Sequence, residues 1–362
     1  MNNKHLIILL VLALSLAAFL IGFLVSQRSL VKQPADIGGA GILEKFNDIP
    51  DKNIKSIPRE DFFSLSKNAV LSPTISKEKT AVIYHDLKNG QVFENNPKNL
   101  VEKIISDKPL PDLMETIWSP NKKEVVSVFS TNKGKNFRYY NYQTNKVVDL
   151  GTSIESLIFS PDGSRVAYFQ PSGLRGAIYV STPDGSSSKK IIETRLSNLE
   201  LYWPSEEYIS FKASVNDGDV VYLLSLTGNL TKLVNETEKI NTLLWSPDGK
   251  TLLYSTKTKG FPSLFVKKIS TSSSKDLKIS TSAHKCVWSI NNKNLFCAVN
   301  QSGQEGDDIY KINTVDGSKE LVISYVKKVF AKQLLLTGAE DFLIIVEETN
   351  DKLYALKITP KN

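Results

Sequence analysis

The fold of this chain is decided by a stretch that recurs along it, and its clearest copy reads LWSPDGKTLLY (residues 244–254). Close copies are IFSPDGSRVAY (158–168) and IWSPNKKEVV (117–126). More divergent copies are YWPSEEYI (202–209) and VWSINNKNLF (287–296). Self-similarity at a fixed period is the sequence signature of repeat architectures, so the period comes before any residue-level interpretation.

The aromatic residue of each copy gives the period. These residues are 118, 159, 203, 245 and 288, so the gaps are 41, 44, 42 and 43 residues. One period before the first copy lies Ile75, and 48 residues after the last lies Leu336, which is followed by an apolar run at 342–346. The chain therefore contains about seven units, with six as the alternative.

Each unit has a physical interpretation as antiparallel strands. Pro sets φ for a tight turn, Asp suits the next position, and Gly takes the left-handed conformation that completes a hairpin. The strand after the turn, for example residues 252–254, has consecutive apolar residues, as expected where both faces are covered. A third strand with an Ile-Tyr or Val-Tyr centre follows, as in residues 178–180 and 221–223, and then a more polar fourth strand.

Four antiparallel strands per repeat of about 42 residues, without a helical period, predict an all-β fold, a β-propeller. We expect it to occupy residues 59–362. The Trp-Ser-Pro-Asp-Gly repeat followed by the Ile-Tyr strand resembles the WD-repeat-like propellers of the TolB-type family, over residues 68–358. That family is related to the propeller domains of prolyl oligopeptidase and dipeptidyl peptidase. The TolB N-terminal domain and a hydrolase Gly-x-Ser-x-Gly motif have no counterpart in this sequence.

Closure of the ring needs a strand from elsewhere in the chain. The sequence ends just after the third strand of its last unit, and an unpaired sheet edge is a liability. We expect a segment within Ile57–Ser66 to supply the missing outer strand.

The N-terminus predicts the compartment. Residues 6–25 carry no charge and are long enough, at 1.5 Å per residue, to cross the hydrocarbon core of a bilayer. We interpret residues 1–27 as a signal anchor that is more consistent with retention than with cleavage, and residues 28–58 as a flexible tether. The prediction is a single-pass protein of the cytoplasmic membrane with its propeller on the extracytoplasmic side.

Composition excludes several classes of function. The formal net charge is +7, but the lysines are interleaved with acidic residues, which indicates a solvated surface and no nucleic-acid partner. Three His and two Cys without metal-ligand spacing indicate no metal site and no cofactor.

Cys286 and Cys297 lie on the first and second strands of the sixth unit. If Ser289 faces Asn294 across the turn, Cys286 faces Cys297. A disulfide, which an extracytoplasmic location would favour, and two buried thiols are both consistent with this placement.

Loops between the second and third strands should all emerge on one face, where propellers commonly bind partners. The binding candidates on this face are Lys133, Lys135, Arg175, Lys259 and Phe261. Arg175 and Phe261 come first among them, because Arg and aromatic residues dominate binding hot spots.

Two functional hypotheses follow. The first is a protein- or polymer-binding scaffold of the cell envelope that is not an enzyme, because no catalytic constellation is recognisable. The alternative is a lyase or glycosidase with its active site in the propeller channel, which requires carboxylates, His or Arg to converge on the axis.

Overall fold

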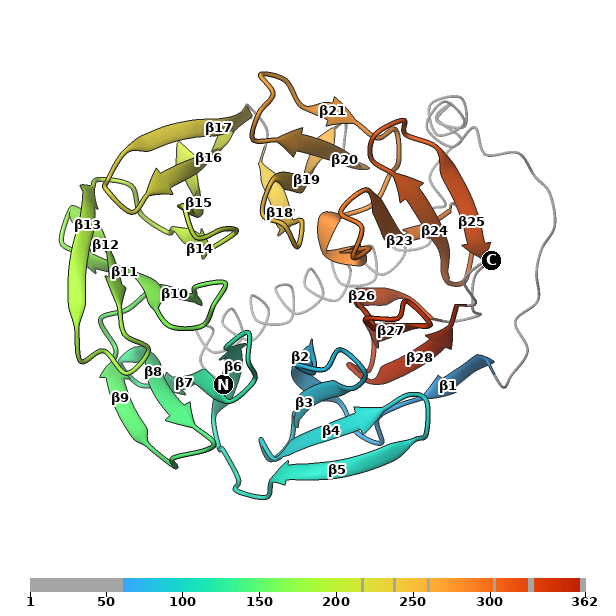
Figure 1. Ribbon diagram of the computed structural model, residues 1–362, viewed down its shortest axis with the longest axis horizontal. Helices are drawn as coiled ribbons and strands as arrows, with labels where there is room; N and C mark the ends of the chain where they lie inside the picture. Colours follow the sequence, from blue (N-terminus) through green and yellow to red (C-terminus); the bar gives the residue numbers. More distant parts are fainter. Residues whose placement is uncertain are drawn as a thin grey trace, which may run out of the picture. The chain divides into compact units, whose positions relative to one another are not determined.

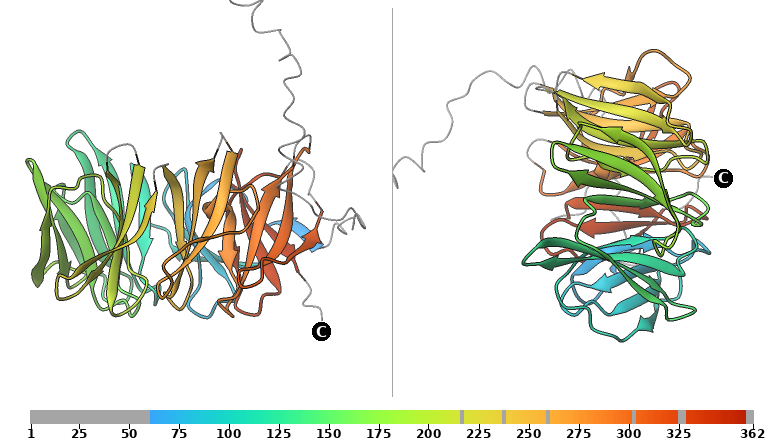
Figure 2. Two further views of the ribbon diagram at one scale, coloured as in Figure 1. Left: turned by 90° about the horizontal axis from the view of Figure 1, so that it is seen from above. Right: turned by 90° about the vertical axis from the view of Figure 1, so that its left-hand side faces the viewer.

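The computed structural model describes residues 61–215, 218–236, 239–258, 261–301, 304–324 and 329–358. These residues form seven antiparallel sheets of four strands each, arranged in a ring (Figure 1). The prediction of a seven-bladed propeller is confirmed, and the alternative of six blades is wrong. In each blade the first strand lies towards the centre of the ring and the fourth at its rim, and the blades stand side by side around it (Figure 2).

The strands follow the chain blade by blade. Blade 1 comprises β2 (Val70–Ile75), β3 (Val82–Asp86), β4 (Val92–Asn96) and β5 (Val101–Ser106). Blade 2 comprises β6 (Leu113–Trp118), β7 (Glu124–Thr131), β8 (Gly134–Asn141) and β9 (Val147–Gly151). Blade 3 comprises β10 (Ser156–Phe159), β11 (Val166–Ser172), β12 (Arg175–Ser181) and β13 (Ser188–Thr194). Blades 4 and 5 comprise β14 (Glu200–Tyr202), β15 (Tyr208–Val215), β16 (Gly218–Ser225) and β17 (Leu230–Glu236); and β18 (Ile240–Trp245), β19 (Thr251–Thr258), β20 (Phe261–Lys268) and β21 (Lys275–Asp276). Blades 6 and 7 comprise β22 (Cys286–Trp288), β23 (Asn294–Asn300), β24 (Asp307–Asn313) and β25 (Lys319–Ile323); and β26 (Ala331–Leu336), β27 (Phe342–Glu347), β28 (Leu353–Lys357) and β1 (Phe62–Ser64).

The repeated Ser-Pro-Asp-Gly stretch forms the turn between the first and second strands, as predicted. Asp248 Oδ1 accepts hydrogen bonds from the Ser246 hydroxyl at 2.6 Å and from the Lys250 amide at 3.1 Å. Gly249 has φ of +66°, and a Cβ atom there would lie 2.0 Å from the Pro204 carbonyl oxygen of the preceding blade. Glycine is therefore required twice, for the left-handed backbone and for the close approach of two blades.

In two other blades the residue at the position of Gly249 also has a left-handed backbone but is not glycine, and its side chain hydrogen-bonds to a neighbouring blade. Glu340 accepts hydrogen bonds from the Ser289 hydroxyl and the Ile290 amide of blade 6. Lys122 donates to the Thr74 hydroxyl of blade 1 at 2.9 Å. These side chains join one first hairpin to the next around the ring.

Recurring aromatic residues pack the blades. Four blades have a pair of rings directly opposite each other on the second and third strands, with centroids 5.0 to 5.9 Å apart. The pairs are Tyr84–Phe93, Tyr168–Tyr179, Phe211–Tyr222 and Tyr254–Phe265. Their fixed register supports a role in packing between blades, where offset stacking stabilises each pair by about 1 kcal/mol beyond area burial.

The predicted closure is confirmed. β1 pairs with β28 and supplies the outer strand of blade 7. Phe62 stacks on Tyr354 at 5.3 Å between centroids, and Phe63 contacts Phe342 edge-on. The chain therefore closes its ring by joining a strand from before the first blade to the last blade.

The predicted membrane segment at 6–25, and with it the boundaries 1–27 and 28–58, lies outside the described residues. Within the residues that the structure does describe, no helix has the length and apolar character needed to cross a bilayer.

Candidate functional site

The predicted binding residues lie on the face that carries the hairpins between second and third strands, which we call the loop face. Lys133 lies in the turn between β7 and β8, and Lys135 lies near the start of β8; both are exposed. Arg175 begins β12 on blade 3 and is also exposed. Phe261 begins β20 on blade 5 and is 50% exposed, and Lys259 lies outside the described residues. The lysines and Arg175 thus share adjacent blades, whereas Phe261 belongs to another sector of the ring.

The tip of the blade 3 hairpin presents one further residue that the sequence did not single out. Ser172 and Arg175 are opposed in the register, so Gly173 and Leu174 form the two-residue turn, with φ of +58° at Gly173. Leu174 is 95% exposed. An apolar side chain beside a guanidinium at a rigid hairpin tip is a combination suited to partner contact.

A second candidate region lies at the mouth of the channel, on the same face. The connection from blade 5 to blade 6 buries Leu277 and Ile279 and ends in a short 3₁₀ helix, η2 (Ala283–Lys285). This helix contacts the inner strands of both blade 5 and blade 7. Because blade 6 stands between those two blades, η2 lies on the channel side of blade 6 (Figure 1).

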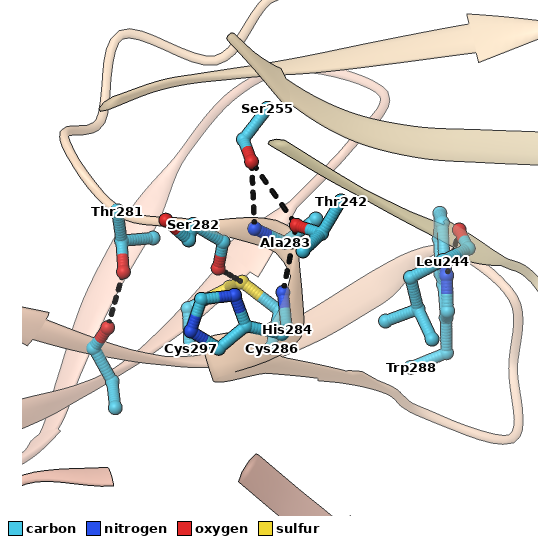
Figure 3. Close-up of a disulfide and its surroundings, with 11 residues drawn as sticks. Thr242, Leu244, Ser255, Thr281, Ser282, Ala283, His284, Cys286, Trp288 and Cys297 are labelled. Atoms are coloured by element: carbon cyan, nitrogen blue, oxygen red, sulfur yellow. Dashed lines mark hydrogen bonds between the residues drawn. A yellow bond between two sulfur atoms is a disulfide. The ribbon is translucent and has the colours of Figure 1, made fainter. Parts of the chain in front are cut away.

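Hydroxyl groups hold η2 in this position (Figure 3). The Ser255 hydroxyl accepts the Ala283 amide at 3.2 Å, and the Thr242 hydroxyl accepts the His284 amide at 3.3 Å. The Thr281 hydroxyl donates to the Ala298 carbonyl at 2.6 Å. The bonds to the Ala283 and His284 amides satisfy backbone groups that a helix this short leaves unpaired, and they fix the position of η2 at the channel mouth.

An ion-pair cluster adjoins the helix. Lys285 Nζ lies 3.3 Å from Asp307 Oδ2 and 3.7 Å from Glu348 Oε2. Asp307 Oδ2 also accepts the amide of Ala331, the first residue of blade 7, at 2.8 Å. In blade 4, Asp219 makes the equivalent bond to the Ile240 amide at 2.7 Å. The buried carboxylate of Asp307 therefore has a structural role, which is to join blade 6 to blade 7.

The pKa values of two side chains in this region, His284 and Asp307, are shifted by their surroundings. Burial, with a contribution from Lys285, lowers the pKa of His284. Burial raises the pKa of Asp307, against the opposing effect of Lys285. At a channel mouth, a neutral imidazole can accept a proton from a bound ligand, and a neighbouring ammonium group can stabilise negative charge on that ligand. Among the described residues, no group of three or more His, Cys, Asp and Glu side chains is arranged to hold a metal ion.

Cys286 and Cys297 follow η2 directly and are joined by a disulfide bond (Figure 3). They are opposed in the register with Cα atoms 4.1 Å apart, the short spacing typical of a non-hydrogen-bonded antiparallel pair. Cys297 occupies the position that holds Tyr168 in blade 3 and Tyr254 in blade 5. In blade 6 a covalent bond to the inner strand thus takes the place of a stacked aromatic ring.

Comparisons with known proteins show similarity in fold. No protein-family model and no curated protein matches this sequence. An oligogalacturonate lyase in complex with manganese aligns with a TM-score of 0.62 at 12% identity, covering 83% of this chain and 93% of that one. An oligogalacturonate lyase from Vibrio parahaemolyticus aligns with a TM-score of 0.62 at 11% identity, covering 85% and 96%. The WD40 repeats of RRP9 align with a TM-score of 0.58 at 9% identity, covering 85% and 100%.

These structures confirm the WD-repeat-like propeller fold expected from the repeat. They also correct one prediction, namely that the chain is not an enzyme. Two lyases share this propeller over more than nine tenths of their length, so the absence of a recognisable catalytic motif does not exclude catalysis. A fold of this kind can assemble a site from single residues on different blades, with no local sequence signature.

Proposed function

We propose that this chain is a binding module of the cell envelope, anchored in the cytoplasmic membrane through residues 6–25 and exposing its propeller on the extracytoplasmic side. Its ligand is an envelope protein or polymer, which it binds through the loop face of blades 2 and 3. The supporting observation is the blade 3 hairpin, on which Leu174 and Arg175 are exposed, together with the exposed Lys133 and Lys135 on the corresponding hairpin of the adjacent blade. The rigid sheets beneath hold these side chains without a large ordering cost on binding.

Crosslinking in intact membranes tests this proposal. The full-length chain, with a photoreactive residue in place of Asn132 in the blade 2 hairpin, should form one dominant crosslinked product. The double variant Leu174→Ser, Arg175→Ala should reduce that product at least about tenfold, because apolar and Arg anchors carry most of the binding energy. The matched control is Leu230→Ser, which changes a similarly apolar residue, 42% exposed, on the outer strand of blade 4. Equal yields from wild type and the double variant would refute the assignment of this face.

A second candidate function is a lyase acting at the channel mouth. It is favoured by the lyases that share the fold and by the lowered pKa of His284 beside Lys285. In this role His284 would abstract a proton from the substrate, and Lys285 would stabilise the developing negative charge. The test is release of unsaturated products, followed by ultraviolet absorbance, from oligogalacturonate and other uronic-acid oligomers. Activity that is lost in His284→Gln and retained in His5→Gln would establish it, whereas activity unchanged in His284→Gln would exclude His284 as the base.

A further inference from the structure

Blade 3 differs from the other blades on the side that faces blade 2. The register places three columns of side chains on this side: Ser172 opposite Arg175, Gln170 opposite Ala177 and Glu193, and Tyr168 opposite Tyr179 and Lys190. Ala177 is the smallest side chain of the central column. Larger polar side chains stand on either side of it, so the sheet surface is hollowed at its centre.

The hollow has a measurable extent. It encloses about 320 Å³ and is lined by Gln170, Ser172, Tyr179, Lys190 and Glu193, with Arg175 at one end. A second hollow of about 290 Å³ lies between blades 2 and 3 and is lined by Tyr168, Ser181 and Asp184 of blade 3 and by residues 148–150 of blade 2. Gln170 lines both. Together they form a cleft that runs along β12 from Arg175 to Ser181, about 20 Å at 3.3 Å per residue.

Three hydrogen-bonding side chains in this cleft have no partner among the described residues. The Gln170 amide, the Ser172 hydroxyl and the Tyr179 hydroxyl all line the cleft, and none of them bonds to another described side chain or backbone group. In blades 1 and 7 the residues at the position of Gln170 bond within their own loops. Asp86 in blade 1 accepts the Lys88 amide, and Glu347 in blade 7 accepts the Thr349 amide. Gln170 thus offers two donors and an acceptor that no local turn consumes.

The charges in the cleft cancel. Glu193 pairs with Arg175 at 2.7 Å and with Lys190 at 3.5 Å, and Asp184 pairs with Lys146 at 2.5 Å. A strongly charged polymer would therefore meet no excess of opposite charge. The floor is the face of a sheet, so it presents side chains where a peptide strand would need free backbone groups. The hollow over Ala177 is lined mainly by polar side chains, whereas the hollow between blades 2 and 3 also has the apolar side chains of Leu150, Ile154 and Leu157 in its lining.

From this combination we infer that the cleft of blade 3 binds a neutral glycan chain, rich in hydroxyl and amide groups, that lies along β12. Gln170, Ser172 and Tyr179 exchange hydrogen bonds with the sugar substituents, and the Arg175 guanidinium donates to ring or hydroxyl oxygens with the nitrogens not engaged by Glu193. Ala177 provides the space in which a sugar ring lies. The inference rests on the proposed function, because it names a polymer class for a site next to the proposed binding face.

Calorimetric titration of the detergent-solubilised full chain with chitohexaose, a neutral glycan with acetamido groups, tests the inference. We expect saturable binding to the wild type. Ala177→Arg, which fills the hollow, should weaken it at least about tenfold, as should the double variant Gln170→Ala, Ser172→Ala, which removes two unpaired groups. Lys189→Ala is the matched control, because Lys189 is exposed on β13 of the same blade and lies opposite Val180, in a column that alternates with those of the cleft. Its affinity should stay within about twofold of wild type.

Each other result overturns the inference. Absence of binding by chitohexaose, or binding that Ala177→Arg leaves unchanged, rejects the cleft as a glycan site. Binding of hexagalacturonate or of a neutral Ala-Ser-Asn decapeptide that exceeds binding of chitohexaose, and that Ala177→Arg abolishes, rejects a neutral glycan as the ligand. Crosslinking with Leu174→Ser alone, which leaves Arg175 and the rest of the cleft lining in place, reports separately on the loop face. The two proposals can therefore fail independently.

Discussion

Blades 6 and 7 secure the ring in two different ways. Blade 7 is completed at the rim by β1, and a hydrogen bond such as that from the Leu353 amide to the Ser66 hydroxyl joins residues 287 positions apart. Blade 6 is tied beside the channel by a disulfide between residues only 11 positions apart. The β1 contacts close a loop of 287 residues and must offset a larger loop-closure entropy than the disulfide, which closes one hairpin. We therefore expect loss of β1 to affect the whole ring and loss of the disulfide to affect mainly the mouth.

The largest effect should come from removing the strand that completes blade 7. Deletion of residues 57–66 removes the pairing of β1, the burial of Leu65 and the partial burial of Phe62 and Phe63, together worth about 5 kcal/mol. We expect the melting temperature, measured by scanning calorimetry, to fall by about 10 °C. Deletion of residues 34–43, a segment of equal length in the predicted tether, is the control and should change it little. A melting temperature that is the same for both deletions would show that β1 is dispensable.

The next largest effect should come from the disulfide. The double variant Cys286→Ala, Cys297→Ala should lose about 2–3 kcal/mol of unfolding free energy in urea, because a short closed loop constrains the unfolded chain less than a long one. Hydrogen exchange should rise mainly in residues 277–285, which lead into the bonded strand. Thiol titration of the protein purified from membranes should detect no free thiol, and two free thiols would contradict the bond.

A smaller effect is expected at the junction of blades 6 and 7. Asp307→Ala should cost about 1–2 kcal/mol, because the buried Ala331 amide loses its acceptor, and Asp307→Asn should cost less because it keeps one. Burial raises the pKa of Asp307, so its contribution to stability is full below the unfolded pKa of about 4 and is lost as the pH rises through the folded value. Relative to Asp307→Asn, the wild type should therefore become less stable in urea as the pH rises from 3.5 to 7. Parallel pH profiles would contradict this assignment.

The smallest effect concerns Lys122, which links blade 2 to blade 1. Burial lowers the pKa of Lys122 from 10.5 to about 8. Its contribution to stability is therefore full above pH 10.5 and is lost as the pH falls through about 8. Between pH 7 and pH 10 the wild type should gain stability relative to Lys122→Met in urea unfolding. Lys123→Met, which changes an exposed neighbour, should follow the wild type.

The fold could be predicted because its determinants are local and repeated. The turn at 246–249 needs only its own residues: Ser246 and Asp248 bond within the turn, and Gly249 takes the left-handed backbone. The opposition of Cys286 and Cys297 followed from the length of one hairpin. The outer strand at Phe62–Ser64 was predictable from a missing fourth strand, because an open sheet edge demands a partner.

The candidate sites could be predicted only in part. The hairpin pattern predicted that Arg175 and Phe261 share the loop face, but nothing local indicated that they belong to different sectors of the ring. The approach of Lys285 to Asp307 and Glu348 joins three separate segments, and no spacing rule predicts it. The cleft depends on the small Ala177 side chain and on the unpaired Gln170 amide, which become meaningful only when three strands are set in register.

A four-stranded sheet repeated about seven times follows from the amino-acid sequence alone, because turn chemistry and strand burial act over a few residues and leave a period that can be read directly. The side-chain contacts between blades, the position of η2 at the channel mouth and the hollow of blade 3 become visible only in the folded ring. These features depend on the radial placement of whole sheets, and contacts between residues tens of positions apart leave no periodic trace in a single sequence.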